Sequence, residues 1–204
     1  MDKSKKIIFI NQSSELYGSD KTLLDLVIRL KTNYAIEPIV IIQESGLLTN
    51  ELDKYNIKYH FLPVIKLHKK MFSPNYLIRL LIDTFQSLKK LRKIIKEDNV
   101  EIIYSNTLTV MLGVLYSFFY KTKHIWHCHE IMYSPKLFVT IYRKILCSKS
   151  IDKVIFNSKA TLDCWVNNSD IINKKAELVY NGIDLNVSLE TDENVAKLRN
   201  SLFP

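Results

Sequence analysis

The stretch HIWHCHE, residues 124–130, joins an apolar run to an abruptly polar end. Its isoleucine and tryptophan are residue types that suit a pleated, half-buried surface. Two imidazoles and a carboxylate follow at once, from His127, His129 and Glu130. In open parallel α/β sheets, ligands bind in the crevice beyond the carboxyl ends of the strands. The stretch therefore predicts a buried strand whose end contributes to a ligand site.

Similar strand-like runs recur along the chain, with amphipathic stretches between them. The expected strands are 6–10, 37–42, 58–62, 101–105, 123–128, 153–157 and 177–180. The expected helices are 21–31, 47–55, 75–97, 107–120, 136–149 and 159–167. This alternation predicts an α/β fold with a doubly wound, mostly parallel, Rossmann-like sheet of about seven strands and helices on both faces.

The chain has 204 residues, of which 47% are hydrophobic, enough to bury one substantial core. The alternating pattern stops after Asp184 and a polar, charged stretch follows. We expect one domain over residues 1–184, with 185–204 as a truncated interdomain linker. The three scattered cysteines, with no secretory leader visible, favour reduced thiols and a cytoplasmic protein.

Basic residues account for the net charge of +8 and are concentrated in one region. Between residues 66 and 96, nine Lys or Arg stand against one acidic residue. Lys66, Lys69 and Lys70 lie among apolar residues in an expected loop and are candidates for contact with an anionic membrane on its cytoplasmic face. The alternative is that the basic residues form the solvated face of a helix. Residues 75–97 would then pack on the sheet through an apolar stripe that includes Leu81 and is flanked by Phe85.

The first expected strand runs into a polar loop, residues 11–20, before a helix. Free N–H groups and the helix dipole at such a helix start suit an anion. The single Gly18 excludes a dinucleotide fingerprint and a P-loop. The alternative is an ordinary loop with Ser19 as the helix N-cap.

His127 and His129 are two residues apart, so on a strand they share a face while Cys128 points away. They can hydrogen-bond a polar substrate, or join Glu130 as metal ligands, although no further cluster with ligand spacing appears. The third alternative is a core histidine, which suits His127 better than His129. We expect no metal.

Small polar residues end three other expected strands, at Asn106, at Asn157–Ser158 and at Asn181–Gly182. Capping of the next helix is the simpler role for any one of them. Four such ends on one sheet edge nevertheless predict a polar crevice.

These strand ends resemble the N-terminal, acceptor-side domain of family 4 glycosyltransferases, which have the GT-B architecture. Four regions carry the resemblance: YGSDKTLLDL (17–26), IIYSNTL (102–108), HIWHCHE (124–130), and VIFNSKATLDCW with LVYNGIDL (154–165 and 178–185). The resemblance implies transfer of a sugar from a nucleotide-activated donor to a glycan or lipid-linked acceptor, with retention of configuration, in the synthesis of cell-surface polysaccharide or lipopolysaccharide. The nucleotide sugar is a co-substrate, and no further cofactor is implied.

By the same resemblance, His129 contacts the transferred sugar near the reacting centre, and the Gly18 loop approaches the donor diphosphate and the acceptor. Tyr17 stands where relatives more often have glycine, so it would narrow that approach. Glu130 stands where relatives often have Asp, and Asn181 would close the last strand. The remaining expected contacts with acceptor or donor are Ser19, Asn106, His127 and Ser158.

The nucleotide-sugar domain of the family is absent from these 204 residues, so we expect the fragment alone to turn over little. The alternative function is a stand-alone, non-catalytic module that binds a phosphorylated glycan or an anionic membrane surface. Nucleic acid is not an expected partner, because aromatic residues are not interleaved with the basic ones on a reading surface.

Overall fold

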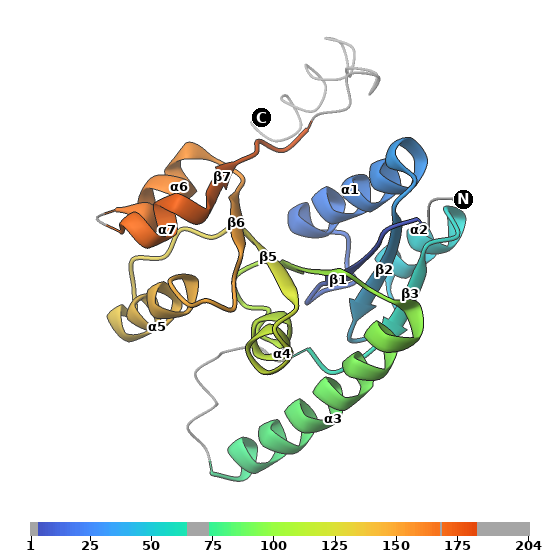
Figure 1. Ribbon diagram of the computed structural model, residues 1–204, viewed down its shortest axis with the longest axis horizontal. Coiled ribbons are helices and arrows are strands. Elements are labelled where there is room, and N and C mark those ends of the chain that lie inside the picture. Colours follow the sequence, from blue (N-terminus) through green and yellow to red (C-terminus); the bar gives the residue numbers. More distant parts are fainter. Residues whose placement is uncertain (1–3, 65–73, 168, 183–204) are drawn as a thin grey trace, which may run out of the picture.

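The computed structural model describes residues 4–64, 74–167 and 169–182, with the side chains of 74–79 excepted, and Figure 1 shows helices around a central sheet. The strands are β1 (Lys6–Ile10), β2 (Glu37–Ile42), β3 (Lys58–Phe61), β4 (Ile102–Asn106), β5 (Lys123–Cys128), β6 (Lys153–Phe156) and β7 (Ala176–Leu178). The helices are α1 (Gly18–Tyr34), α2 (Leu47–Lys54), α3 (Pro74–Asp98), α4 (Leu112–Tyr120), α5 (Lys136–Leu146), α6 (Lys159–Val166) and α7 (Asp170–Lys175).

The seven strands form one sheet in the order β3-β2-β1-β4-β5-β6-β7, and each neighbouring pair is parallel. The predicted Rossmann-like sheet is therefore confirmed. The chain leaves β1 toward β2 and β3, then crosses back to β4, so the order reverses between β1 and β4. Such a switch point opens a crevice at the carboxyl ends of the strands.

Two separate hydrophobic clusters cover the two faces of the sheet, as side-chain alternation along buried strands requires. On one face, α3 to α7 pack against alternate strand residues such as Trp126 and Val154. On the other face, α1 and α2 pack through Leu23 and Leu48 against Phe9 and its neighbours. Cys128 lies in the first cluster. It therefore points away from the face of His127, as predicted.

The start of α1 differs from the prediction, and the reason is its cap. The helix begins at Gly18 with Tyr17 as N-cap, so Ser19 lies inside the first turn and is not the cap. Tyrosine has no side chain that caps a helix well. Instead the carboxylate of Asp20, three residues later, accepts a hydrogen bond from the backbone N–H of Tyr17 over 3.3 Å.

Two other helices also differ. The fourth begins at Leu112 instead of residue 107, because the Thr107 carbonyl accepts a hydrogen bond from the Trp126 indole over 2.7 Å. Helix α7 was not predicted; Ser169 caps it by accepting from the N–H of Ile172. Both changes come from single polar groups that end or start a helix locally.

The apolar stripe predicted for α3 packs only along its second half. Leu91 and Ile95 are buried, whereas Leu81 and Phe85 are 61% and 71% exposed. Figure 1 shows the reason: α3 runs along the molecule and its first turns extend past the sheet. The prediction that Leu81 and Phe85 pack on the sheet is therefore wrong. Within the described part of the chain, no helix is long and apolar enough to cross a membrane.

Candidate functional site

His129, just after β5, lies between two carboxamides. Its Nε2 is 2.9 Å from Oδ1 of Asn106, at the end of β4. Its Nδ1 is 3.3 Å from Nδ2 of Asn157, just after β6. Burial lowers the pKa of the imidazole from 6.5 to about 4, so the ring is neutral at physiological pH. The ends of β4 and β6 therefore meet at His129 and hold it from both sides.

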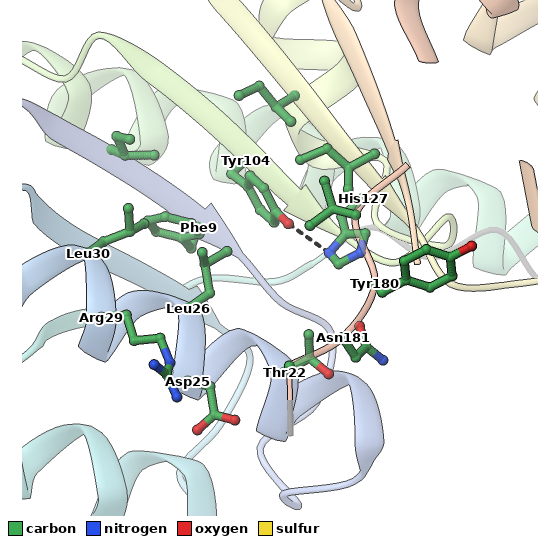
Figure 2. Close-up of a pocket in the computed structure, with 15 residues that line it drawn as sticks. Phe9, Thr22, Asp25, Leu26, Arg29, Leu30, Tyr104, His127, Tyr180 and Asn181 are labelled. Carbon is green, nitrogen blue, oxygen red and sulfur yellow. Dashed lines mark hydrogen bonds between the residues drawn. The ribbon is translucent and has the colours of Figure 1, made fainter. Parts of the chain in front are cut away.

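His127 stacks on His129, with ring centroids 3.9 Å apart. It is 5% exposed, and the hydroxyl of Tyr104 hydrogen-bonds its Nδ1 over 2.7 Å (Figure 2). Desolvation, aided by His129, lowers the pKa of His127 to about 3. Two residues apart on one strand, the imidazoles share a face as predicted. His127 is thus a core histidine, bonded to a tyrosine.

Asn106 connects this pair to the first strand and the first helix. Its Nδ2 donates to Oδ1 of Asn11 over 2.9 Å and to the carbonyl of Ser19 over 3.1 Å. Asn11 in turn donates to the carboxylate of Asp20 over 2.8 Å. Asn106 is fully buried and does not cap the next helix. The simpler capping role is therefore wrong for Asn106.

Glu130 stabilises the turn after β5. One carboxylate oxygen accepts from the backbone N–H groups of Leu108 and His129, over 3.0 and 3.1 Å. Its own carbonyl accepts from the Trp165 indole over 2.8 Å. Burial raises the pKa of the carboxyl group, and the two backbone bonds oppose that rise. Among the described residues, no three His, Cys, Asp or Glu side chains lie together as possible metal ligands.

Ser158 caps α6, accepting from the N–H of Thr161 over 3.1 Å. The side chain of its neighbour Asn157 instead points toward His129 and contributes to the site. Asn157 is one of the predicted polar strand ends, whereas Asn11 and Asp20 are site residues that the sequence reasoning misses. The available signals were an acid three residues into a helix and an amide directly after an apolar run.

The remaining predicted residues surround this cluster more loosely. Tyr17 is 71% exposed, and a Cβ added at Gly18 would meet no atom within 4 Å, so the start of α1 is open. Asn181 is exposed and lies three residues beyond the end of β7. The three lysines proposed for membrane contact, Lys66, Lys69 and Lys70, lie outside the described residues.

A cavity of about 450 Å³ lies between α1 and the sheet, and Figure 2 shows its lining. Its floor comes from apolar side chains of β1 and β4 to β6, and one end is formed by Tyr180 and Asn181. Thr22, Asp25 and Arg29 of α1 contribute its polar side. His127 lines the cavity and links it to the cluster around His129.

Comparison with solved structures finds the same fold in a glycosyltransferase and in two proteins that were solved with a nucleotide sugar bound. Anabaena HepE in complex with UDP-glucose matches with a TM-score of 0.69 at 20% identity, over 97% of this chain and 49% of HepE. A glycosyltransferase from Rickettsia africae matches with a TM-score of 0.69 at 19% identity, over 99% of this chain and 50% of its own. A UDP-GlcNAc 2-epimerase from Neisseria meningitidis, bound to UDP-GlcNAc, matches with a TM-score of 0.57 at 11% identity, over 85% of this chain and 46% of its own.

The chain spans about half the length of these proteins. At such low identity these likenesses show the fold alone. The search of curated proteins found no match. The sequence itself matches the model of Glycosyltransferase Family 4 over residues 24–187, which is most of the chain. On this match, and in agreement with the resemblance of its strand ends, the chain belongs to glycosyltransferase family 4.

Proposed function

We propose that this chain is the acceptor-side domain of a glycosyltransferase. In the complete enzyme it would help transfer a sugar from a nucleotide-activated donor to a glycan or lipid-linked acceptor, with retention of configuration. The single observation that carries the proposal is His129, held between Asn106 and Asn157 at the carboxyl edge of the sheet. We assign the pathway to cell-surface polysaccharide or lipopolysaccharide synthesis.

The chemistry of the site suits a neutral, hydroxyl-rich ligand. Imidazole and carboxamide groups both donate and accept hydrogen bonds, so they match sugar hydroxyls. A lowered histidine pKa keeps a positive charge away from the site. The open start of α1 adds backbone N–H groups and a positive helix end, which favour the phosphates of a donor.

A nucleotide sugar is the proposed co-substrate. HepE was solved with UDP-glucose and, in a second structure, with UDP and glucose. The epimerase bound to UDP-GlcNAc has the same fold but a different reaction, so fold alone does not decide the chemistry. We expect the second domain to hold most of the nucleotide, and we propose no further cofactor.

The proposal is tested by measuring sugar transfer in a protein that includes the downstream sequence. His129→Ala should lower kcat by at least tenfold, because it removes the side chain that contacts the transferred sugar. Ser169→Ala is the matched control: it removes the cap of α7, away from the site, and costs about 1 kcal/mol of stability. Equal kcat for His129→Ala and wild type would remove His129 from the mechanism.

We also propose that the domain lies against the cytoplasmic face of an anionic membrane. Support comes from α3, where Leu81, Ile82 and Phe85 are more than half exposed and Lys89 and Lys90 follow on the same helix. Apolar and basic side chains together suit a lipid surface.

Sedimentation with anionic vesicles, repeated with neutral vesicles and with an oligonucleotide over a salt series, tests this membrane proposal. Phe85→Ser should weaken binding to anionic vesicles without changing stability, since the side chain is exposed. Phe118→Ser, at an exposed position on α4, is the matched control. Equal binding to oligonucleotide and vesicles would contradict the choice of lipid as the partner.

A further inference from the structure

A series of hydrogen bonds leads from Asp20 through Asn11 and Asn106 to His129. The buried end of the series, at Asp20, decides which group donates and which accepts in each bond. Asp20 is fully buried, and its Oδ1 accepts from Nδ2 of Asn11 over 2.8 Å. The carbonyl of Ser13 accepts from the same Nδ2, also over 2.8 Å. A carboxylate and a carbonyl can only accept. The amide nitrogen of Asn11 must therefore face them, and its Oδ1 must face Asn106.

The next amide is oriented by the same rule. Asn106 has to present its nitrogen to Oδ1 of Asn11, 2.9 Å away. The second hydrogen on that nitrogen goes to the carbonyl of Ser19, which again can only accept. The orientation of Asn106 is thus fixed twice. Its Oδ1 consequently faces Nε2 of His129, over 2.9 Å.

An oxygen that faces Nε2 requires a proton on that nitrogen. In a neutral imidazole the other nitrogen, Nδ1, then carries the lone pair. Nδ2 of Asn157 lies 3.3 Å from Nδ1 and can donate to it. The orientation of Asn157 agrees, because its Oδ1 accepts from the hydroxyl of Thr161 over 3.0 Å. No step in the sequence of bonds conflicts with another.

We propose that Asp20, Asn11 and Asn106 are positioning residues that hold His129 as the Nε2–H tautomer. His129 then presents an acceptor, Nδ1, directly beside a donor, Nδ2 of Asn157. One hydroxyl can donate to the first and accept from the second. In the series from Asp20 through Asn11, Asn106 and His129 to Asn157, the last bond is the longest, at 3.3 Å. It is therefore the bond that an incoming hydroxyl opens most easily. This last step rests on the proposed function; the tautomer does not.

The tautomer is measurable in this chain without substrate. Long-range ¹H–¹⁵N correlation spectra of the ¹⁵N-labelled protein at pH 7.5 distinguish protonated from unprotonated ring nitrogens. His129→Gln identifies the signals of His129 among those of the five histidines. We expect a protonated Nε2 and an unprotonated Nδ1. A wild-type spectrum with the proton on Nδ1 would overturn the proposal.

Three variants locate the origin of this preference. Asn106→Ala removes the acceptor that faces Nε2 and should shift the tautomer ratio toward Nδ1–H by roughly fivefold, the value of one neutral hydrogen bond. Asn106→Asp, as the protonated acid, can donate to Oδ1 of Asn11 and accept from Nε2, so it should retain the wild-type tautomer. Asn157→Ala is the matched control: it removes an amide from the other side of the ring and should leave the proton on Nε2.

The opposite pattern would overturn the proposal, namely a tautomer that changes in Asn157→Ala and stays constant in Asn106→Ala. If Asn106→Ala fails to fold, the wild-type and Asn157→Ala spectra still decide the question. Failure of the proposed function is distinguishable. If His129→Ala transfers sugar at the wild-type rate while the Nε2–H tautomer is observed, the positioning residues stand and the catalytic role falls.

Discussion

The buried histidines His124 and His127 should make this protein sensitive to mild acid. Burial lowers the pKa of both imidazoles to about 3 in the folded chain, against 6.5 in the unfolded one. Below pH 6.5 the unfolded state therefore binds protons that the folded state does not. The free energy of unfolding is then highest above pH 6.5 and falls as the pH decreases, until the folded pKa is reached.

The size of this effect follows from linkage. Each imidazole contributes a slope of about 1.4 kcal/mol per pH unit over that range. At pH 4.5, two units below the unfolded pKa, His124 and His127, together with His129 and its folded pKa of about 4, remove roughly 8 kcal/mol. A domain is typically stable by only about 5–15 kcal/mol. We therefore expect acid unfolding between about pH 4 and 5.

The assay is urea unfolding between pH 5 and 7.5, followed by the fluorescence of the buried Trp126 and Trp165. His127→Phe removes one titrating group, so its slope should be lower by about 1.4 kcal/mol per pH unit. It also loses the bond to Tyr104, at a cost of about 1 kcal/mol. The variant should thus be less stable at pH 7.5 and more stable below about pH 6.

Tyr104→Phe is the matched control, because it breaks the same hydrogen bond and keeps the imidazole. It should show the full slope of the wild type. If His127→Phe and the wild type lose stability in parallel as the pH falls, His127 does not titrate between the two states and the reasoning is refuted.

Three further predictions concern packing and capping. Gly113→Ala should lower stability by about 1–3 kcal/mol in thermal unfolding, because the new Cβ would overlap Oγ of Ser105 and lie 3.0 Å from His124. This overlap outweighs the usual helix gain of about 0.5–1 kcal/mol from replacing glycine with alanine, and higher stability would contradict the packing. Ser158→Ala should cost about 1 kcal/mol through loss of the α6 cap, whereas Ser158→Asp should cost less, both measured by urea unfolding. A thiol reagent should modify the half-buried Cys147 first, and rapid reaction of Cys128 would contradict its full burial and its raised pKa.

The strands were predictable because each is a short, nearly continuous apolar run that both faces of the sheet must cover. Three of them have the predicted bounds, and the other four differ by one or two residues at one or both ends. Helix starts were less predictable because one polar contact decides them. The N–H of Tyr17 donates to the carboxylate of Asp20, and the acid at this position was the only sign of it, because tyrosine is not a typical N-cap residue.

The site was predictable in outline only. Alternation along a strand places His127 and His129 on one face, and the structure stacks them. The partners of His129 follow the strands on either side of β5, but Asn106 is itself held by a residue far away in the chain. Asn11 and Asn106 are 95 residues apart, and they meet because β1 and β4 pair at the switch point. That adjacency is a property of the sheet order, which local sequence patterns do not contain.

The residue types explain why Glu130 stabilises the turn after β5, whereas Asn106 belongs to the candidate site. Glu130 can only accept while it is ionised, so it ends on two backbone N–H groups. Asn106 has both a donor and an acceptor, so it can stay fully buried while it passes a hydrogen-bond direction from β1 to β5. A row of carboxamides is thus a physical means of orienting a half-buried imidazole without placing a charge next to it. The same argument supports a neutral ligand group in the proposed site, since His129 and Asn157 offer a matched acceptor and donor and no ionised side chain among the described residues hydrogen-bonds the imidazole.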